Sequence, residues 1–328
     1  MESRASTKPH QLATMAEREL VIGILSIGDM GVGIGKLLIS QGYKVATFAE
    51  DRSEHTRERA KSSGIELLSS IAALVSESAC ILSIVPPRDA LTTAQRVADV
   101  TSSEASTREN PLYYLDLNAI APSHASQIES LFAPTPNIIF IDGGIIGGPP
   151  RLKPDAPIGW TRPSIVVSGP TKLPYIDLAQ TLNIDHITDT IGPASGLKMC
   201  FASTTKGFIA IAIQSLVTAE AMGVYPQLRG YLEKHNKEAL AIADRGVVSM
   251  PPKAYRWVNE MQQIGRTMEE EGGFSSGLFD GVAEVYRVVA EDTALGLEQP
   301  GRRQRGLTVD DVVTVMREGM KATKQKLD

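Results

Sequence analysis

A lysine near the start of a long apolar run is the residue best placed for acid–base chemistry. Residues 195–222 contain no proline and are rich in Ala, Ile, Leu and Met, which predicts one long helix with Lys198 near its N-terminus. A cation there opposes the helix dipole, and partial burial disfavours the ammonium, so both effects are expected to lower the lysine pKa. A neutral lysine can accept a hydroxyl proton while hydride leaves the same carbon, and a charged lysine can return a proton to a carbonyl oxygen or nitrogen. The alternative is a surface lysine whose stem covers apolar surface.

A glycine-containing turn follows the first predicted strand, residues 20–25, and precedes a helix predicted over residues 32–41. Backbone N–H groups at such a helix N-terminus, together with the helix dipole, favour a nucleotide pyrophosphate. Gly28 would let the backbone approach the phosphates, and Gly31 would let the helix pack closely on the strand. Ser26 occupies the first glycine position of the G-x-G-x-x-G pattern, so a merely structural turn is the alternative.

Both kinds of nucleotide-selecting residue follow the second predicted strand. An acid here, Glu50 or Asp51, would take the ribose 2′-hydroxyl and select NAD. Arg52 and Ser53, with Arg57 nearby, form a cluster compatible with the 2′-phosphate of NADP. Because a guanidinium offers bidentate contact to phosphate, we predict NADP, with NAD as the alternative cofactor. A second alternative is that Arg52 simply begins the next solvated helix.

The elements that must position these residues are short apolar runs that alternate with amphipathic stretches. The predicted strands are residues 20–25, 44–48, 79–85, 112–117, 138–141 and 164–168. Helical segments between them imply right-handed crossovers and a largely parallel sheet. We therefore predict an α/β, doubly wound, dinucleotide-binding domain over residues 20–190. An all-α substrate and dimerisation domain over residues 191–328 would follow, headed by the long helix as an interdomain element, and residues 1–19 would form a disordered tail.

Composition excludes several other classes of protein. The 328 residues carry a net charge of −5, which argues against a nucleic-acid partner. No apolar stretch reaches the roughly 20 residues that span a bilayer, and the N-terminal residues lack the apolar segment of a secretory signal. Two cysteines and five scattered histidines give neither a disulfide framework nor metal-ligand spacing, so we predict no metal site. Cytoplasmic localisation is the expectation, and the basic run at residues 302–305 is expected to be a solvated loop.

Four motifs occur in one order along the chain. They are Asp29-Met30-Gly31, Asp116-Leu117-Asn118, Asp142-Gly143-Gly144-Ile145-Ile146-Gly147-Gly148 and the segment from Gly192 to Lys198. Together they resemble the β-hydroxyacid dehydrogenase family, which includes 6-phosphogluconate and 3-hydroxyisobutyrate dehydrogenases and, as relatives, the imine reductases. The segments 198–200 and 254–261 resemble a subgroup with a 6-phosphogluconate-dehydrogenase-like C-terminal domain.

The resemblance implies a role for each matching residue. Lys198 would be the catalytic acid/base, Asn118 would lie near nicotinamide and substrate, and Gly147 with Gly148 would receive a substrate carboxylate. The implied cofactor site comprises Gly28, Asp29, Met30, Gly31, Arg52, Ser53, Val85, Pro86 and Asn118. The resemblance also implies a homodimer in which the long helices interdigitate, with the active site in a cleft between domains.

Two positions depart from the family pattern. Ile146 stands where the family usually has a serine, and Ala202 stands where it usually has an asparagine. Thr205 is then the nearest polar candidate on the helix face of Lys198, and it is a predicted substrate residue. Because two side-chain ligands for a small hydroxyacid are absent, a bulkier or less acidic substrate is expected.

An aromatic and basic cluster at Tyr255, Arg256 and Trp257 could close the substrate site, which would make Trp257 a substrate residue. The alternative is a packed helix face with Arg256 in an ion pair. The whole pattern predicts an NAD(P)-dependent oxidoreductase that transfers hydride between nicotinamide and a hydroxyl- or carbonyl-bearing carbon of a small molecule. Imine or enamine reduction on the same fold and a non-catalytic NADP(H)-binding regulatory protein are the alternatives.

Overall fold

The computed structural model describes most of the chain. The described ranges are residues 17–103, 110–135, 137–299 and 302–327. The chain divides into two compact units, residues 1–198 and residues 199–328. The division falls inside the longest helix.

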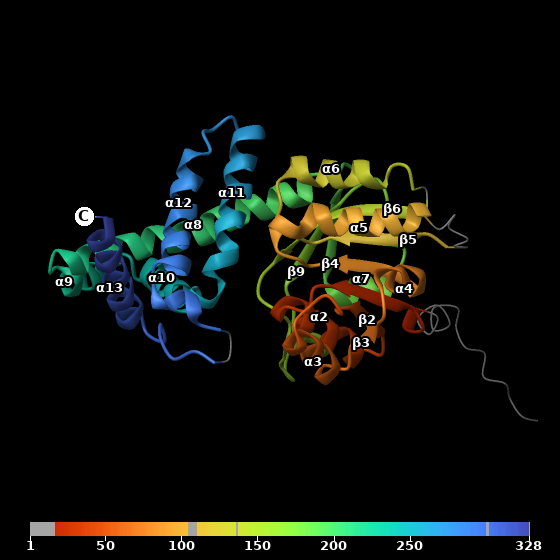
Figure 1. Ribbon diagram of the computed structural model, residues 1–328, viewed down its shortest axis with the longest axis horizontal. Helices are drawn as coiled ribbons and strands as arrows, with labels where there is room; N and C mark the ends of the chain where they lie inside the picture. Colours follow the sequence, from red (N-terminus) through yellow and green to blue (C-terminus); the bar gives the residue numbers. More distant parts are fainter. Residues whose placement is uncertain (1–16, 104–109, 136, 300–301, 328) are drawn as a thin grey trace, which may run out of the picture. The chain divides into compact units, whose positions relative to one another are not determined.

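The N-terminal unit is built on one eight-stranded sheet (Figure 1). Its strands are β1 (Val21–Leu25), β2 (Lys44–Phe48), β3 (Glu66–Leu68), β4 (Ser78–Ser83), β5 (Leu112–Asp116), β6 (Ile138–Ile146), β9 (Ser164–Ser168) and β10 (Ile184–Thr188). They are ordered β10-β9-β6-β5-β4-β1-β2-β3, and every neighbouring pair is parallel except β6 with β9. The chain starts at β1 in the middle of the sheet and winds outward in both directions, so the doubly wound α/β prediction is confirmed.

Helices cover both faces of this sheet (Figure 1). One face packs against α2 (Asp29–Ser40), α3 (Glu54–Ser62) and α7 (Ile176–Leu182). The other packs against α4 (Ile71–Glu77), α5 (Ala90–Ser103) and α6 (Pro122–Phe132). Alternation along the strands divides the two cores: Ile22 and Ile24 belong to the first, Ile81 and Tyr114 to the second.

Several elements lie beyond the predicted set. The edge strands β3 and β10 were not predicted, and a small hairpin joins β7 (Arg151–Leu152) to β8 (Trp160–Thr161). Strand β6 runs to Ile146 instead of ending at Ile141. It continues because residues 142–146 pair with β9 in the antiparallel sense, which the glycines of this segment obscure in the sequence.

The N-terminal segment predicted as a disordered tail has an ordered end. Residues 1–16 lie outside the described residues, so disorder there stays a prediction. Glu17, in contrast, accepts hydrogen bonds from the backbone N–H groups of Ile176, Asp177 and Leu178. Its carboxylate thereby caps the N-terminus of α7, where a negative charge is favoured by the helix dipole.

The C-terminal unit is helical, as predicted. It contains most of α8 (Pro193–Ala221), followed by α9 (Tyr225–His235), α10 (Lys237–Ser249), α11 (Ala254–Glu270), α12 (Gly277–Glu291) and α13 (Val309–Leu327). Helices α11 and α12 are amphipathic, and their buried faces contribute Trp257, Met261, Ile264, Phe279 and Tyr286 to the core.

The first turn of α8 belongs to the N-terminal unit, although the predicted domain boundary stands at residues 190/191. The units divide between Lys198 and Met199. The cause is local bonding, because backbone N–H groups of Ala194 and Ser195 donate to side chains of β9 and β6.

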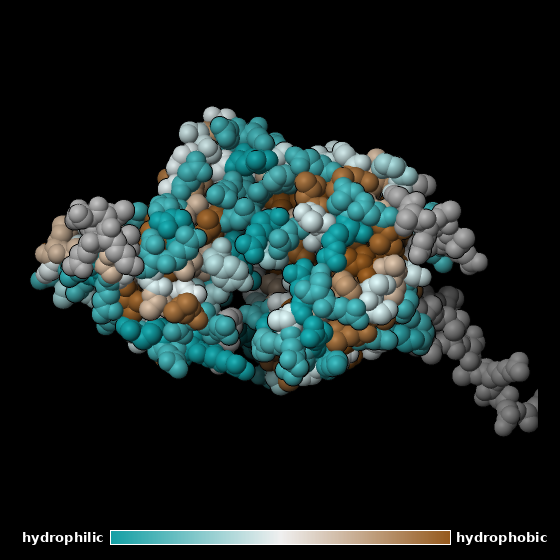
Figure 2. Space-filling view, viewed as in Figure 1, coloured by the Kyte–Doolittle hydropathy of each residue, from teal (hydrophilic) through white to brown (hydrophobic). Residues whose placement is uncertain are grey.

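The surface shown in Figure 2 is largely hydrophilic, with apolar patches over both units. Within the described part of the chain, α8 is the one helix long and apolar enough to cross a membrane by length and composition. Core helices of soluble proteins have the same property, and 39% of its most apolar window is buried.

Candidate functional site

The glycine turn between β1 and α2 has the close packing that its sequence predicts. A Cβ atom on Gly31 would lie 2.2 Å from the backbone oxygen of Ser26, so a side chain there is excluded. Gly28 is the N-cap of α2 and has no side chain to accept from the helix N–H groups. A Cβ on Gly28 would meet no atom within 4 Å, so this face of the turn is open. Gly31 is therefore fixed by the fold, whereas Gly28 keeps free space at the helix N-terminus, where an anion binds best.

Ser26 adopts the backbone conformation that favours glycine. Its φ is +82°, in the left-handed region. The turn therefore keeps a glycine-like shape although a serine occupies the first glycine position. The G-x-G-x-x-G pattern is incomplete at Ser26, but the backbone of the turn accommodates this serine.

Val85 and Pro86 lie beside this turn. They follow β4, which pairs with β1, and the Ile84 N–H donates to the Leu25 oxygen at 3.0 Å. The next strand, β5, pairs with β4, and the Leu117 N–H donates to the Ser83 oxygen. The carboxyl ends of β1, β4 and β5 thus lie side by side, the edge where open α/β sheets bind ligands.

The segment after β2 carries a cluster of arginines around one carboxylate. Asp51 is contacted by Arg52 Nε at 3.4 Å and by Arg96 Nη1 at 3.0 Å. Arg57 donates to the backbone oxygens of Glu50 and Arg52 and so holds the loop from within. Arg96 comes from α5 and was not predicted, since it lies 45 residues from Asp51 in the sequence.

Ser53 has a structural task in this loop. Its hydroxyl accepts from the Thr56 N–H and caps the N-terminus of α3, as Ser does at many helix starts. The predicted phosphate contact of Ser53 therefore competes with the cap. Arg59, also unpredicted, lies 3.5 Å from Asp29 in the first turn of α2 and places a cation beside the glycine turn.

Asn118 is buried at the carboxyl end of β5. Its side-chain amide donates to Ser83 Oγ at 3.0 Å and to Asp116 Oδ2 at 2.8 Å, and its backbone N–H donates to Asp116 Oδ1 at 3.0 Å. The Oδ1 atom of Asn118 is a buried acceptor without a hydrogen-bond partner. The donor groups of Asn118 therefore fix its side chain, and its Oδ1 atom remains available as an acceptor.

Two carboxylates lie beneath this edge, on neighbouring strands. Asp116 and Asp142 are register partners across β5 and β6, and both are fully buried. Burial raises the pKa of Asp116 to about 7, and the Asp142 carboxylate acts in the same direction, against the two hydrogen bonds from Asn118. Burial also raises the pKa of Asp142, although hydrogen bonds from Ser195, Ser168 and Gly192 oppose it.

Lys198 lies over β6. A Cβ built on Gly144 would come within 2.7 Å of Lys198 Cβ and 3.1 Å of its Cγ, so the stem of the lysine packs directly on the glycine backbone. The residue is half-buried. Gly144 and Asp142 lie on the same face of β6, so the predicted catalytic residue packs on the strand that carries the buried carboxylate.

The Gly147-Gly148 turn is followed by two prolines that lie against α2. A Cβ on Gly33 of α2 would meet Pro150 at 3.0 Å and Pro149 at 3.2 Å. Gly147 has a φ of +122°, which only glycine adopts readily, and the space around Gly148 is open. The two glycine turns, more than 100 residues apart in the sequence, thus belong to one region.

The other two predicted substrate residues belong to the helical unit. The Thr205 hydroxyl donates to the Phe201 and Ala202 oxygens of its own helix. Trp257 is 6% exposed, packs edge-to-face on Tyr286 at 5.1 Å and faces Lys206 Nζ at 5.2 Å from the ring centroid. The geometry favours the packed-face alternative for Trp257, because its ring contributes to the core of the unit.

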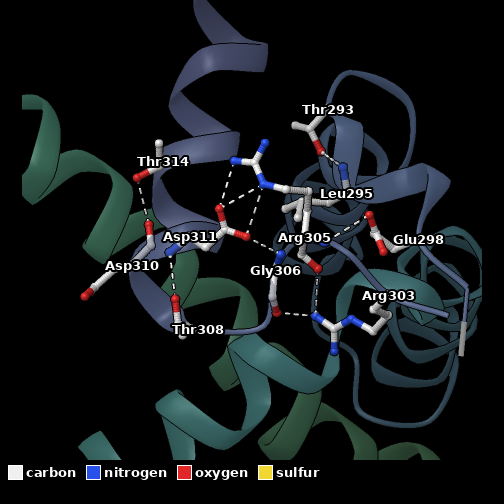
Figure 3. A network of polar contacts seen from close by, with 10 residues as sticks. All are labelled: Thr293, Leu295, Glu298, Arg303, Arg305, Gly306, Thr308, Asp310, Asp311 and Thr314. Atoms are coloured by element: carbon white, nitrogen blue, oxygen red, sulfur yellow. Dashed lines mark hydrogen bonds and ion pairs between the residues drawn. The ribbon is translucent and has the colours of Figure 1, made fainter. Parts of the chain in front are cut away.

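The basic run at residues 302–305 is a loop with Arg302 and Gln304 exposed, as expected, but Arg303 and Arg305 are held by hydrogen bonds (Figure 3). Arg305 contacts Asp311 of α13 through Nε and Nη2, at 3.0 and 2.8 Å to Oδ1. Arg303 donates to the Val248 oxygen at 2.7 Å and also to the Gly306 oxygen, and Glu298 accepts the Gln304 N–H at 2.7 Å. Arg305 thereby joins this loop to α13, and Arg303 joins it to α10. The contact of Arg303 with Val248 could not be predicted, because its acceptor is a backbone oxygen 55 residues away.

Among the described residues no group of three or more His, Cys, Asp or Glu side chains is placed to hold a metal ion, and both cysteines are free. The polar groups gathered at the sheet edge are amides, hydroxyls, a lysine and backbone N–H groups. Such a set binds anions and moves protons.

Comparison with known proteins identifies two domains. Residues 21–154 match the NAD binding domain of 6-phosphogluconate dehydrogenase, and residues 219–289 match a domain of unknown function (DUF1932). The matches confirm the resemblance that the four motifs predicted.

Relatives extend over most of the chain. An uncharacterized 28.5 kDa protein in the 7S RNA 5′ region of Methanothermus fervidus is 27% identical over 216 residues, covering 64% of this chain and 77% of that protein. The 3-hydroxyisobutyrate dehydrogenase of Mycobacterium tuberculosis with L-serine has a TM-score of 0.63 at 16% identity, covering 91% of this chain and 99% of that one. An imine reductase variant from Myxococcus stipitatus in complex with NAD+ has a TM-score of 0.51 at 16% identity, with the same coverage. At these identities the solved structures establish the fold.

Proposed function

The chain matches the NAD binding domain of 6-phosphogluconate dehydrogenase and a DUF1932 domain, and we propose that it is a cytoplasmic, NADP-preferring oxidoreductase with Lys198 as its general acid/base. Hydride transfer would take place between nicotinamide and a hydroxyl- or carbonyl-bearing carbon. The observation that carries the proposal is the packing of Lys198 on Gly144, in the unit that also holds the glycine turn and Asn118.

The residues of the glycine turn fit a dinucleotide. The turn combines a helix N-terminus without a side-chain cap, an open face at Gly28 and a close approach at Gly31 that requires glycine. The first-turn N–H groups of α2 would hold the pyrophosphate, and Asn118 Oδ1 would offer an acceptor at the nicotinamide end. When bound, the cofactor supplies the hydride acceptor or donor.

Lys198 would accept a proton from the reacting group or donate one to it. As a neutral amine it accepts the hydroxyl proton during oxidation, and as an ammonium it donates a proton to the carbonyl oxygen during reduction. The stem of the lysine packs on the backbone of Gly144, which fixes the position of its Cβ and Cγ atoms. A positioned acid or base of this kind contributes about 10²–10⁴-fold to rate.

The choice of NADP over NAD rests on the arginines around Asp51. The guanidiniums of Arg52 and Arg96 neutralise the Asp51 carboxylate, which would otherwise repel a 2′-phosphate. Arg52 and Arg96 then present the planar donors that phosphate prefers. Arg96 would join Arg52 in this role, while Ser53 mainly shapes the loop.

The proposed substrate is a small molecule bound at the Gly147-Gly148 turn, bulkier or less acidic than a simple hydroxyacid. Ile146 supplies no hydroxyl beside that turn, and Ala202 supplies no amide. Backbone N–H groups remain for a weakly anionic or carbonyl group. The same two residues favour a second candidate, reduction of a cyclic imine, where the lysine ammonium would protonate nitrogen.

One set of measurements tests the proposal. NADPH and NADH are titrated by fluorescence against the wild type and Lys198→Ala, and hydroxyacids, ketones and cyclic imines are then screened by absorbance. The proposal expects both proteins to bind NADPH equally, with turnover reduced at least about a hundredfold in the variant. Binding of neither nucleotide below millimolar concentration would overturn it. Tight NADPH binding with turnover unaffected by Lys198→Ala would exclude the lysine mechanism, and turnover of imines alone would reverse the order of substrates.

We also propose a homodimer through α8. Phe201 and Ile211 are exposed on one side of this helix, Met222 is exposed directly after its end, and the other exposed residues of the helix are uncharged. A two-fold axis brings a face against itself, so an uncharged face suits a second copy of the chain. Light scattering should give twice the chain mass for the wild type and one chain mass for Phe201→Glu/Ile211→Glu. Leu297→Glu, an exposed position off this helix, is the control, and a monomeric wild type would overturn the proposal.

A further inference from the structure

The head of α8 is held by a carboxylate from a distant strand. Asp142 Oδ2 accepts from the N–H groups of Gly192 at 3.0 Å and Ser195 at 3.1 Å, and from Ser168 Oγ at 2.9 Å. Asp142 Oδ1 accepts from Ser195 Oγ at 2.5 Å. Ser168 Oγ in turn accepts the Ala194 N–H at 3.0 Å. Each of these residues is buried.

This arrangement replaces an ordinary helix cap. The residue before α8 is Gly192, which has no side chain and a φ of +113°, and the first helical residue is Pro193. An acceptor for the N–H groups that have no partner within the helix must therefore come from elsewhere, and Asp142 supplies it from 50 residues away. The negative charge also lies at the positive end of the helix dipole.

The clamp, meaning the set of hydrogen bonds that Asp142 accepts at the head of α8, joins the same two elements as the lysine contact, β6 and α8. On β6, Asp142 is two residues before Gly144 and on the same face, and on α8, Ser195 is three residues before Lys198. One contact is a set of hydrogen bonds, and the other is the packing of Lys198 on Gly144. Two contacts at different points along one strand fix both the translation and the rotation of the helix about its axis.

We propose that Asp142 is a positioning residue for Lys198, acting through Ser195. The carboxylate sets the rotation of the first turn of α8 and thereby directs the lysine stem onto Gly144. The inference deepens the proposed function, because positioning matters for catalysis only if Lys198 is the acid/base. Its effect on the lysine itself is independent of any substrate.

The test measures the lysine directly. Wild type, Asp142→Asn and Ser195→Ala are acetylated with a succinimidyl ester over a range of pH, and the rate at Lys198 is followed by mass spectrometry against Lys237, which is 75% exposed. Ser195→Ala keeps every charge in place, so a change there reports position. Both variants should change the Lys198 rate relative to Lys237 by about tenfold and shift its apparent pKa, since one hydrogen bond to a charged group is lost. Where turnover is available, kcat should fall while nucleotide affinity is unchanged.

Thr47→Val is the matched control. The Thr47 hydroxyl is also fully buried in this unit and donates to the Ile24 oxygen at 2.6 Å, away from the clamp. It should lose comparable stability and leave the labelling of Lys198 unchanged. Unchanged labelling in folded Asp142→Asn and Ser195→Ala would overturn the inference. If Lys198→Ala keeps full activity while labelling does respond to Asp142→Asn, the clamp stands and the proposed function fails.

Discussion

The stem of Lys198 lies against the bare backbone of Gly144, close enough that a single methyl group on the glycine would come within 2.7 Å of Lys198 Cβ. The contact joins β6, the third strand in the sheet order, to α8 without any polar group. Since real side chains do not approach to that distance, glycine at residue 144 is a requirement of the lysine position.

Gly144→Ala should therefore displace Lys198. We expect a loss of turnover of about a hundredfold with NADPH affinity retained, together with a destabilisation of about 1–3 kcal/mol from overpacking. Kinetics and urea denaturation measure the two effects. Gly230→Ala, at an open position within α9, is the control and should be neutral or slightly stabilising. A Gly144→Ala enzyme with normal turnover would show that the lysine root is not confined.

Two glycines of the turn between β1 and α2 should have different roles, Gly31 in folding and Gly28 in nucleotide binding. Gly31→Ala places a Cβ 2.2 Å from the Ser26 oxygen and should unfold the turn, whereas Gly28→Ala meets no atom within 4 Å and should fold normally. Because pyrophosphate must approach the backbone at Gly28, that variant should still bind NADPH about tenfold or more weakly. Thermal melting and fluorescence titration together make the distinction. Unchanged NADPH binding by Gly28→Ala would place the phosphates elsewhere.

The strand, turn and helix of the proposed nucleotide site were predictable because their signal is local. Strand, turn and helix follow one another within residues 20–41, and periodicity alone locates them. The place of Lys198 near the start of a long apolar helix was predicted in the same way, and its catalytic role stays a prediction. Ser26 was harder, because its residue type says nothing about the left-handed φ that the turn imposes on it.

The supporting contacts could not be predicted, because each joins segments far apart in the sequence. Asp142 meets Ser195 across 53 residues, and Arg96 meets Asp51 across 45. Neither pair has a spacing that signals contact, and only the strand order brings the partners together. Trp257 shows the opposite case, since an unusual residue type suggested a substrate contact where packing explains it.

The buried Asp116 should make stability depend on pH. Its pKa is raised from about 3.8 to about 7, so between these values the folded state holds a proton that the unfolded state has released. A group of this kind stabilises most below its unfolded pKa, and stability then falls as pH rises, by about 1.4 kcal/mol per unit, until the folded pKa is passed.

Asp116→Asn cannot ionise and should lose that part of the pH dependence. The variant should resemble the wild type most closely near pH 4–5 and be more stable than the wild type at pH 8, provided that the single amide oxygen still accepts from Asn118. Urea denaturation at pH 5, 6, 7 and 8 measures the difference. Parallel pH profiles for the two proteins would contradict the prediction.

The helical unit contains an ion pair whose loss should be costly. Lys206 of α8 and Glu260 of α11 are in contact, with side chains 17% and 7% exposed. Lys206 Nζ also lies 5.2 Å from the Trp257 ring centroid, and the Tyr286 hydroxyl donates to the Lys206 oxygen. Removing one partner leaves the other charge buried, which costs about 3–5 kcal/mol, whereas removing both leaves no charge unpaired.

We therefore expect Glu260→Gln and Lys206→Met each to lower the free energy of unfolding by about 3 kcal/mol, and the double variant to lose clearly less than the sum. The chain has two tryptophans, so a Trp160→Phe background leaves Trp257 fluorescence as a reporter of the helical unit during urea denaturation. Glu284→Gln, which removes an exposed partner of Arg287, is the control and should cost less than about 1 kcal/mol. Additive losses in the double variant would mean that Lys206 and Glu260 stabilise the unit independently, through packing and not through their pairing.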